Sequence, residues 1–159
     1  MKPCIKSLLA TLVVSLSIAA PGLAGPFEDG KAAYERGDYV TALRLMLPLA
    51  EQGQTNAQFS IGIMYALGKG VRHDYVEAVK WFRKAAEQGD ASAQNSLGSM
   101  YLNGYGVLQD FVEAHKWFNL AAARGDKHAE KNRATVSIAM TRTQIAEAQR
   151  LAREWKPKK

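Results

Sequence analysis

The sequence predicts an all-α solenoid, a stack of antiparallel helix pairs that ends in a C-terminal capping helix. The first observation is a repeat: positions 54–89 and 90–125 align without a gap, and more than half of the 36 aligned pairs are identical. The second is the spacing of apolar residues, which recur every three or four positions within each half of a copy. The third is that every glycine of one copy has its counterpart in the other, which chance similarity between two helical segments would not produce. A fixed period of this length indicates a helical array.

Residues 1–24 have the pattern of a cleavable signal peptide. Two lysines precede the uncharged apolar run 7–20, and Gly22-Leu23-Ala24 fits a small-x-small cleavage site before Gly25. The run is shorter than the roughly 20 apolar residues of a membrane-spanning helix, which disfavours the alternative of an uncleaved anchor. Export predicts a periplasmic or secreted protein, with an envelope of Gram-negative type.

Removal of this segment changes the charge and the cysteine content. Without Lys2 and Lys6 the chain keeps 19 of its 21 basic residues beside all 15 acidic ones, a net charge of +4. The single cysteine, Cys4, is lost as well. The exported chain therefore enters an oxidising compartment without a disulfide, and packing alone must stabilise it.

Residues 25–53 predict a first, degenerate helix pair. The run "GKAAYERGDYVTALRLMLPLAEQG" connects Tyr34 to the helix-starting Asp38 in four residues, against nine in the next copy. We therefore expect a tight turn here and longer, glycine-bearing loops later. Pro48 lies inside the predicted second helix and should kink it or loosen its last turn.

The two full copies, 54–89 and 90–125, each predict a helix pair. Asp74 and Asp110 are good N-caps for the second helices, and a glutamate three residues later suggests a capping box. Small residues are expected where paired helices cross, and tryptophans between neighbouring pairs. The predicted structural repeat positions are Gly62, Tyr65, Gly68, Gly70, Ala78, Trp81, Gly98, Tyr101, Gly104, Gly106, Ala114 and Trp117.

Residues 126–159 predict the C-terminal helices that cap the solenoid. A further repeat begins near Ala129 but loses the Gly-x-Gly loop, and Thr141 with Gln144 has the capping-box pattern. The basic end "REWKPKK" is interpreted as a solvated, frayed tail, with weak contact to an anionic envelope surface as the alternative. Nucleic acid is not an expected partner, because the chain is predicted to be exported.

The run "AQNSLGSMYLNGYGVLQDFVEAHKWFNLAAARGD" resembles the Sel-1-like repeat, a 36-residue relative of the tetratricopeptide repeat. The first unit, "GKAAYERGDYVTA", resembles the tetratricopeptide type more closely, and the tail "AEAQRLAREW" is similar to the ends of bacterial members. The resemblance covers about residues 27–133. It implies a right-handed superhelix that binds proteins or peptides, chiefly on its concave face.

The same resemblance places the first helix of each pair on the inner face. Residues off the packing stripe of these helices are the candidates for a partner-binding groove: Lys31, Tyr34, Asn56, Phe59, Ile63, Ala66, Ser92, Asn95, Ser99 and Leu102. Amides can hydrogen-bond a peptide backbone, and Phe59 with Ile63 could hold an apolar side chain. The alternative for Phe59 is that it packs against the preceding unit.

The sequence predicts no enzyme, no cofactor and no metal. His73, His115 and His128 lack the spacing of a helical metal site and are interpreted as incidental surface histidines. No serine lies in a Gly-x-Ser-x-Gly elbow or a Ser-x-x-Lys motif after residue 24. The predicted function is an exported scaffold for a protein or peptide partner. The alternatives are an envelope-associated hydrolase or β-lactam-binding protein, and a structural subunit of an envelope complex.

Overall fold

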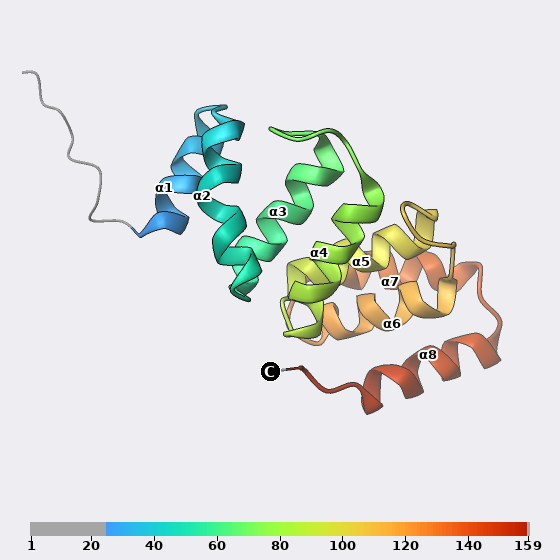
Figure 1. Ribbon diagram of the computed structural model, residues 1–159. Coiled ribbons are helices and arrows are strands. Elements are labelled where there is room, and N and C mark those ends of the chain that lie inside the picture. The colour runs from blue at the N-terminus through green and yellow to red at the C-terminus, as the bar shows by residue number, and fades with distance from the viewer. Residues whose placement is uncertain (1–24, 159) are drawn as a thin grey trace, which may run out of the picture.

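The computed structural model describes residues 25–158 and contains eight α-helices and no strand within that range (Figure 1). The predicted signal peptide lies outside the described residues. The helices are α1 (Pro26–Glu35), α2 (Tyr39–Glu51), α3 (Thr55–Leu67), α4 (Tyr75–Glu87), α5 (Ala91–Asn103), α6 (Phe111–Ala122), α7 (Lys127–Ile138) and α8 (Arg142–Glu154). None of these helices is long and apolar enough to cross a membrane.

The helices stack in sequence order. The pairs α1–α2, α3–α4 and α5–α6 pack most closely, and the second helix of each pair also packs against the first helix of the next. The predicted all-α solenoid of stacked antiparallel pairs is therefore confirmed. The odd-numbered helices α1, α3, α5 and α7 hold equivalent places in successive units.

Glycines allow the two helices of a pair to approach closely. A Cβ atom at Gly62 would lie 2.6 Å from Cδ1 of Phe82, and one at Gly98 would lie 2.7 Å from Cδ1 of Phe118. Gly30 has the same role in the first pair, where the nearest atom is Cγ of Met46 at 2.8 Å. The nearest side chain opposite Gly62 is thus the large Phe82.

Two glycines in each long loop have separate tasks. Gly68 and Gly104 end α3 and α5 in the left-handed conformation, with φ of 63° and 70°. Gly70 and Gly106 instead lie against the preceding unit, because a Cβ there would be 2.6 and 2.3 Å from the carbonyl oxygens of Tyr39 and Tyr75. The loop of one unit therefore rests on the start of the previous unit's second helix.

The tryptophans fill the junctions between units. Trp81 is 8% exposed and belongs to a buried cluster with Met46 of α2 and Ile61 of α3. Trp117 is 5% exposed and packs in the next cluster with Phe82 of α4 and Leu97 of α5. Each indole thus contacts the unit before its own, which ties successive pairs into one core.

The predicted N-caps are present at the helix starts, but only one of the predicted capping boxes is. The carboxylates of Asp74 and Asp110 each accept two backbone hydrogen bonds as N-caps, and Thr141 with Gln144 forms a full capping box. The capping boxes expected at Glu77 and Glu113 are wrong. A lysine three residues later attracts each carboxylate outward: Glu77 pairs with Lys80, and Glu113 with Lys116.

The C-terminal segment docks on the stack, so the prediction of a frayed tail is wrong as far as Lys158. Helix α8 lies along α6 instead of pairing with α7 (Figure 1). The ring of Trp155 meets that of Trp117 edge-on, with centroids 6.3 Å apart. The amide of Lys158 donates to the carbonyl of Glu87 at 2.7 Å, one of the carbonyls that the end of α4 leaves without a helical partner.

Candidate partner-binding face

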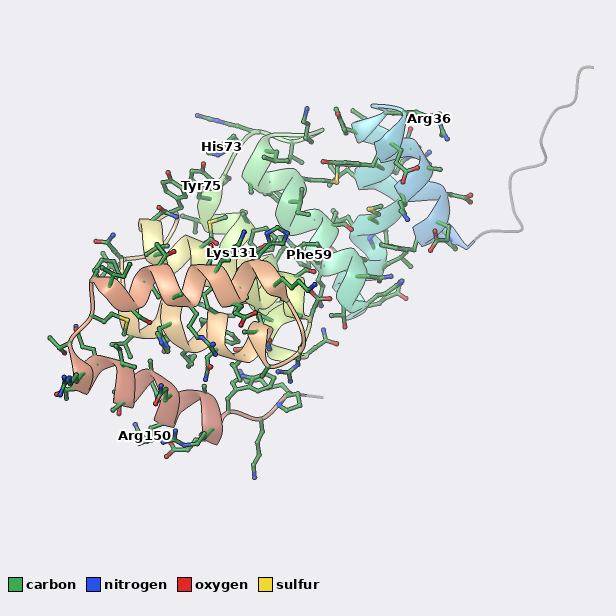
Figure 2. All side chains as sticks on the ribbon, turned by 180° about the vertical axis from the view of Figure 1, so that it is seen from behind. Arg36, Phe59, His73, Tyr75, Lys131 and Arg150 are labelled. Atoms are coloured by element: carbon green, nitrogen blue, oxygen red, sulfur yellow. The ribbon has the colours of Figure 1, made fainter. Side chains whose placement is uncertain are left out.

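The inner face is defined here as the side chains of α1, α3, α5 and α7 that point away from the even-numbered helices. Figure 2 views this side, with α7 in front and Phe59 of α3 beside it. The crossing glycines 30, 62 and 98 set the register between units. They align three rows: Phe27, Phe59, Asn95 and Lys131; Lys31, Ile63, Ser99 and Thr135; and Tyr34, Ala66, Leu102 and Ile138.

The middle of the inner face is uncharged. Helices α3 and α5 contain no acidic or basic residue, whereas every other helix contains charged residues. Within the three rows, charge enters only at the two ends, through the exposed Lys31 on α1 and the exposed Lys131 on α7. An uncharged polar surface between two cations can hydrogen-bond a partner without repelling either charge sign at its centre.

A small pocket opens between α1 and α3. Its lining residues are Lys31, Tyr34, Met46, Ser60 and Ile63, and its volume is about 110 Å³. Three of the five belong to the predicted groove set, and the structure brings them together across a unit boundary. Most of the lining surface is apolar, so the pocket suits a hydrocarbon group.

Phe59 and Ile63 do not share this pocket. The ring of Phe59 packs against Phe82 of its own pair, with centroids 5.8 Å apart. The expected alternative, packing against the preceding unit, is therefore wrong: Phe59 packs on the cluster that contains Phe82 and Leu97, and not on the cluster that contains Met46 of α2. Phe59 stays half-buried at the edge of the core around Leu97, while Ile63 reaches the pocket.

The polar residues of the predicted groove differ in whether their side chains already make hydrogen bonds within the protein. The Oδ1 atom of Asn95 accepts from Nδ2 of Asn132 at 3.0 Å, which links α5 to α7. Ser99 donates back to the carbonyl of Asn95 at 3.1 Å. Asn56 and Ser92 are exposed at the first turns of α3 and α5. Together with Lys31, these two are the predicted groove residues that are exposed.

Leu102 and Ala66 contribute less to a groove. Leu102 is partly buried against the cluster that contains Phe118 of α6 and Val136 of α7. Ala66 is partly buried against the core around Leu97. The third row therefore shields the core at its middle positions, whereas Tyr34 at its start lines the pocket.

Sequence reasoning missed two lining residues, Met46 and Ser60. Met46 lies on α2, whereas the groove residues were predicted only on the first helix of each pair, which we call the inner-helix rule. The sequence signal for Met46 is the glycine opposite it, because Gly30 leaves room for Met46 to reach between α1 and α3. Ser60 lies on the inner helix α3 but is not among the predicted groove residues; its hydroxyl donates to the carbonyl of Asn56 at 2.9 Å.

His115 is not a surface histidine, so that prediction is wrong. Its side chain is 3% exposed, and its Nδ1 atom has no hydrogen-bond partner among the described residues. Burial lowers the pKa of His115 below its usual range, and the positive charge of Arg133 lowers the pKa further. His115 occupies the repeat position of the buried Val79, which is the sequence signal that would have placed it in the core. Within residues 25–158 no three potential ligand side chains cluster as a metal site would require.

Comparison with known proteins agrees with this geometry. The family model described as the Sel1 repeat matches residues 23–54, 55–90 and 91–126, bounds that differ from the predicted units by one or two residues. No curated protein matches the sequence.

Two solved structures are similar to the chain. One is c5321, a protective antigen from uropathogenic Escherichia coli strains that displays an SLR fold, with a TM-score of 0.79 and 31% identity. The other is a Sel1 repeat protein from Oxalobacter formigenes, with a TM-score of 0.68 and 30% identity. Each match covers 82% of this chain but only 29% and 56% of those longer chains, respectively.

The three matched repeats account for well over half of the sequence, and the observed glycine, aromatic and helix-pair geometry repeats with them. Sel1 repeats form helical scaffolds that typically mediate protein interactions. The chain belongs to the Sel1 repeat family.

Proposed function

We propose that the chain is exported and acts, in the periplasm or outside the cell, as a helical-repeat scaffold that holds a protein or peptide partner along its inner face. The observation that carries the proposal is the uncharged, partly polar surface of α3 and α5. It lies on a stack whose junctions are filled by buried tryptophans, so the surface is held in one shape. A preorganised surface lowers the ordering cost of binding.

The side chains on this face suit an extended polypeptide. A peptide offers one donor and one acceptor per residue along its backbone, and amides and hydroxyls can meet both. Asn56 and Ser92 are exposed, and they occupy equivalent positions one repeat apart. The pocket at Ile63 adds a place for an apolar side chain. Together these features support recognition by hydrogen bonds with an apolar anchor.

The proposal includes no reaction and no cofactor. A hydrolase would need a nucleophile and a base in contact, and the buried His115 has no hydrogen-bonded partner at Nδ1 within the described chain. A structural role in an envelope complex is the remaining rival. That rival would use the outer helices or α8, so it makes a different prediction about which face touches the partner.

Site-specific photo-crosslinking in cells separates these roles. A photoreactive amino acid at Asn56 or Ser92 probes the inner face, and one at the exposed Lys80 or Arg150 probes the outer side. We expect one discrete adduct from the inner positions only, which mass spectrometry then identifies. Adducts from the outer positions alone would contradict inner-face binding and favour the structural role.

A second measurement tests the same surface by mutation. Replacing Asn56 and Ser92 by arginine adds bulk and charge without touching the core, so the helical circular dichroism should stay unchanged. The inner-face adduct, read from a photoreactive residue at Ser99, should fall at least tenfold. An unchanged adduct would remove the first turns of α3 and α5 from the proposed binding site.

Export has its own test. Fractionation of cells that express the full chain should place it in the periplasm or the medium, and its intact mass should correspond to a chain that starts at Gly25. Retention of the chain in the cytoplasm at full mass would contradict both the signal peptide and the proposed location.

A further inference from the structure

We propose that the pocket between α1 and α3 is an anchor subsite that accepts one aliphatic side chain of the partner, next to an acidic group that pairs with Lys31. This inference rests on the proposed inner-face function and specifies the kind of partner. The partner segment is a peptide in which a leucine-like residue stands next to aspartate or glutamate.

The size of the pocket sets the first half of this specificity. Its volume is about 110 Å³. An apolar cavity of about 150 Å³ is enough to bind benzene, so the pocket has room for a branched aliphatic side chain but not for an indole. The buried Met46 forms the floor, and Ile63 and Tyr34 form the walls. Leucine, isoleucine and valine therefore fit best.

The pocket is also built on fixed parts of the structure. Met46 is 2% exposed and belongs to the same buried cluster as Trp81. The ring of Tyr34 is held edge-on by Tyr39, with centroids 5.1 Å apart. A pocket whose floor is core and whose wall is held by another ring does not need to reorganise when a side chain enters it.

Lys31 sets the second half of the specificity. Its side chain is exposed at the pocket, and no ion pair within residues 25–158 includes it. Across the pocket α3 offers only uncharged groups, among them the Ser60 hydroxyl. A carboxylate beside the buried side chain can therefore approach the ammonium group. Glu28, Asp29 and Glu35 on the same helix are the competing charges, and they make a basic peptide the alternative that the experiment must exclude.

The equivalent place between α3 and α5 has different residues. In repeat register Lys31 corresponds to Ile63, Met46 to Phe82, and Ile63 to Ser99. Phe82 is larger than Met46 and already carries the ring of Phe59. The cation and the methionine floor thus occur together only at the first of these two junctions. The anchor would fix which end of the partner lies at α1.

The probes are four short peptides that differ at one position each: acetyl-Gly-Leu-Glu-Gly-amide and its versions with Ala for Leu, Gln for Glu, and Lys for Glu. Each is titrated into the purified ¹⁵N-labelled protein and followed by two-dimensional NMR. We expect shifts at the amides of Lys31, Tyr34, Ser60 and Ile63. The Ala peptide should bind at least tenfold more weakly than the parent, and the Gln peptide two- to fivefold more weakly, since an exposed ion pair contributes little.

Two variants make the result specific. Met46→Phe copies the residue that the next repeat has opposite its glycine, so the fold should tolerate it, and it should reduce binding of the parent peptide at least tenfold. Lys31→Glu should reverse the preference, so that the Lys peptide binds more tightly than the Glu peptide. Lys80→Glu on the outer face is the matched control and should change neither affinity.

The outcomes distinguish this inference from the function it rests on. Equal binding of the Leu and Ala peptides, shifts confined to other residues, or tighter binding of the Lys peptide to the unmodified protein would overturn the anchor subsite. If that happens while the cross-links at Asn56 and Ser92 persist, the scaffold function stands without the anchor. If the peptides bind as expected but no inner-face cross-link forms in cells, the subsite stands and the scaffold function fails.

Discussion

The junction between the first unit and α3 differs from the junction between the two full repeats, although glycines organise both. At the first junction Gly70 rests on the carbonyl of Tyr39, and the amine of Lys69 lies 4.7 Å from the centre of the Tyr39 ring. At the second, Gly106 rests on Tyr75, and the ring of Tyr105 stacks on that of Tyr75 with centroids 4.7 Å apart. The backbone contact is conserved while the side chain above it changes from a cation to a ring.

The same division holds inside the helix pairs. Glycine is constant where the helices cross, and the residue that fills the space is Met46 in the first unit and Phe82 in the second. The glycines therefore determine how closely the paired helices approach, because a Cβ atom at these positions would collide with a side chain of the other helix. The large residues determine which cavities remain, and the pocket at Lys31 occurs where the filling residue is methionine.

The largest expected effect comes from adding a methyl group at the conserved backbone contact. Gly106→Ala places a Cβ 2.3 Å from a carbonyl oxygen at φ of 67°. Left-handed backbone costs about 1–2 kcal/mol for a non-glycine residue, and overpacking adds about 1–3 kcal/mol. We expect the free energy of unfolding, measured in urea, to fall by about 3 kcal/mol or more.

Gly125→Ala is the matched control for this substitution. Gly125 has a similar φ of 88°, but an added Cβ meets no atom within 4 Å. Only the backbone term should remain, a loss of about 1–2 kcal/mol. Equal losses for the two variants would mean that the loop does not press against Tyr75 as described.

The second expected effect concerns the end of the stack, where no Gly-x-Gly loop follows. Trp155 takes part in covering Trp117 and is itself only half-buried. Trp155→Ala should lower the free energy of unfolding by about 2 kcal/mol, less than a fully buried tryptophan would cost. Lys156→Ala, at an exposed neighbouring position, should change it by less than about 0.5 kcal/mol. A loss below 0.5 kcal/mol for Trp155→Ala would show that the tail does not stabilise the fold.

The third expected effect contrasts His115 with Val79 at the same repeat position. Because the pKa of His115 is lowered in the folded protein, the unfolded chain takes up the proton first as the pH falls below about 6.5. Stability is therefore fully present above that pH and decreases below it, by at most about 1.4 kcal/mol per pH unit. His115→Val should remove this component, so the variant should lose less stability than the parent between pH 7.5 and 5. Identical pH profiles would contradict the burial of a neutral imidazole.

Much of this architecture could be predicted from the sequence because it depends on period and residue size. The helix pairs, the left-handed glycines 68 and 104, and the buried Trp81 and Trp117 all follow from positions that recur every 36 residues. His115 was misplaced because its chemistry, rather than its repeat position, was used to place it.

The remaining errors concern contacts that have no period. The docking of Lys158 on Glu87 joins two segments far apart in the chain, and only one copy of it exists. The pocket likewise depends on one methionine in an outer helix. Of the predicted groove residues, which all lie on the first helices of the pairs, Lys31, Tyr34 and Ile63 line this pocket. The inner-helix rule cannot select Met46, because it considers only the first helix of each pair and Met46 lies on the second.

The smallest expected effect tests a polar contact that differs between the two junctions. At the first, the buried Gln58 accepts a hydrogen bond at Oε1 from Nε2 of Gln88 at 2.8 Å. At the second, Oε1 of the fully buried Gln94 has no partner among the described residues. The residue equivalent to Gln88 is Arg124, whose guanidinium instead lies 5.0 Å from the centre of the Trp155 ring. Arg124 therefore contacts Trp155 and donates to the carbonyl of Leu120 at 3.2 Å, and it does not donate to Gln94.

Arg124→Gln should therefore change the free energy of unfolding in two opposite ways, and one of the two requires Trp155. The new amide can donate to Gln94 Oε1, worth about 1 kcal/mol, but the cation–π contact of about 0.5–1 kcal/mol is lost. Alone, the substitution should change the free energy of unfolding by less than about 0.5 kcal/mol. In a Trp155→Ala background the cation–π loss has already occurred, so the same substitution should be more favourable there than in the parent, by about 0.5–1 kcal/mol. Arg124→Ala, which offers no donor, should not stabilise in either background, and an equal effect of Arg124→Gln in both would mean that the tail and Gln94 do not compete for this position.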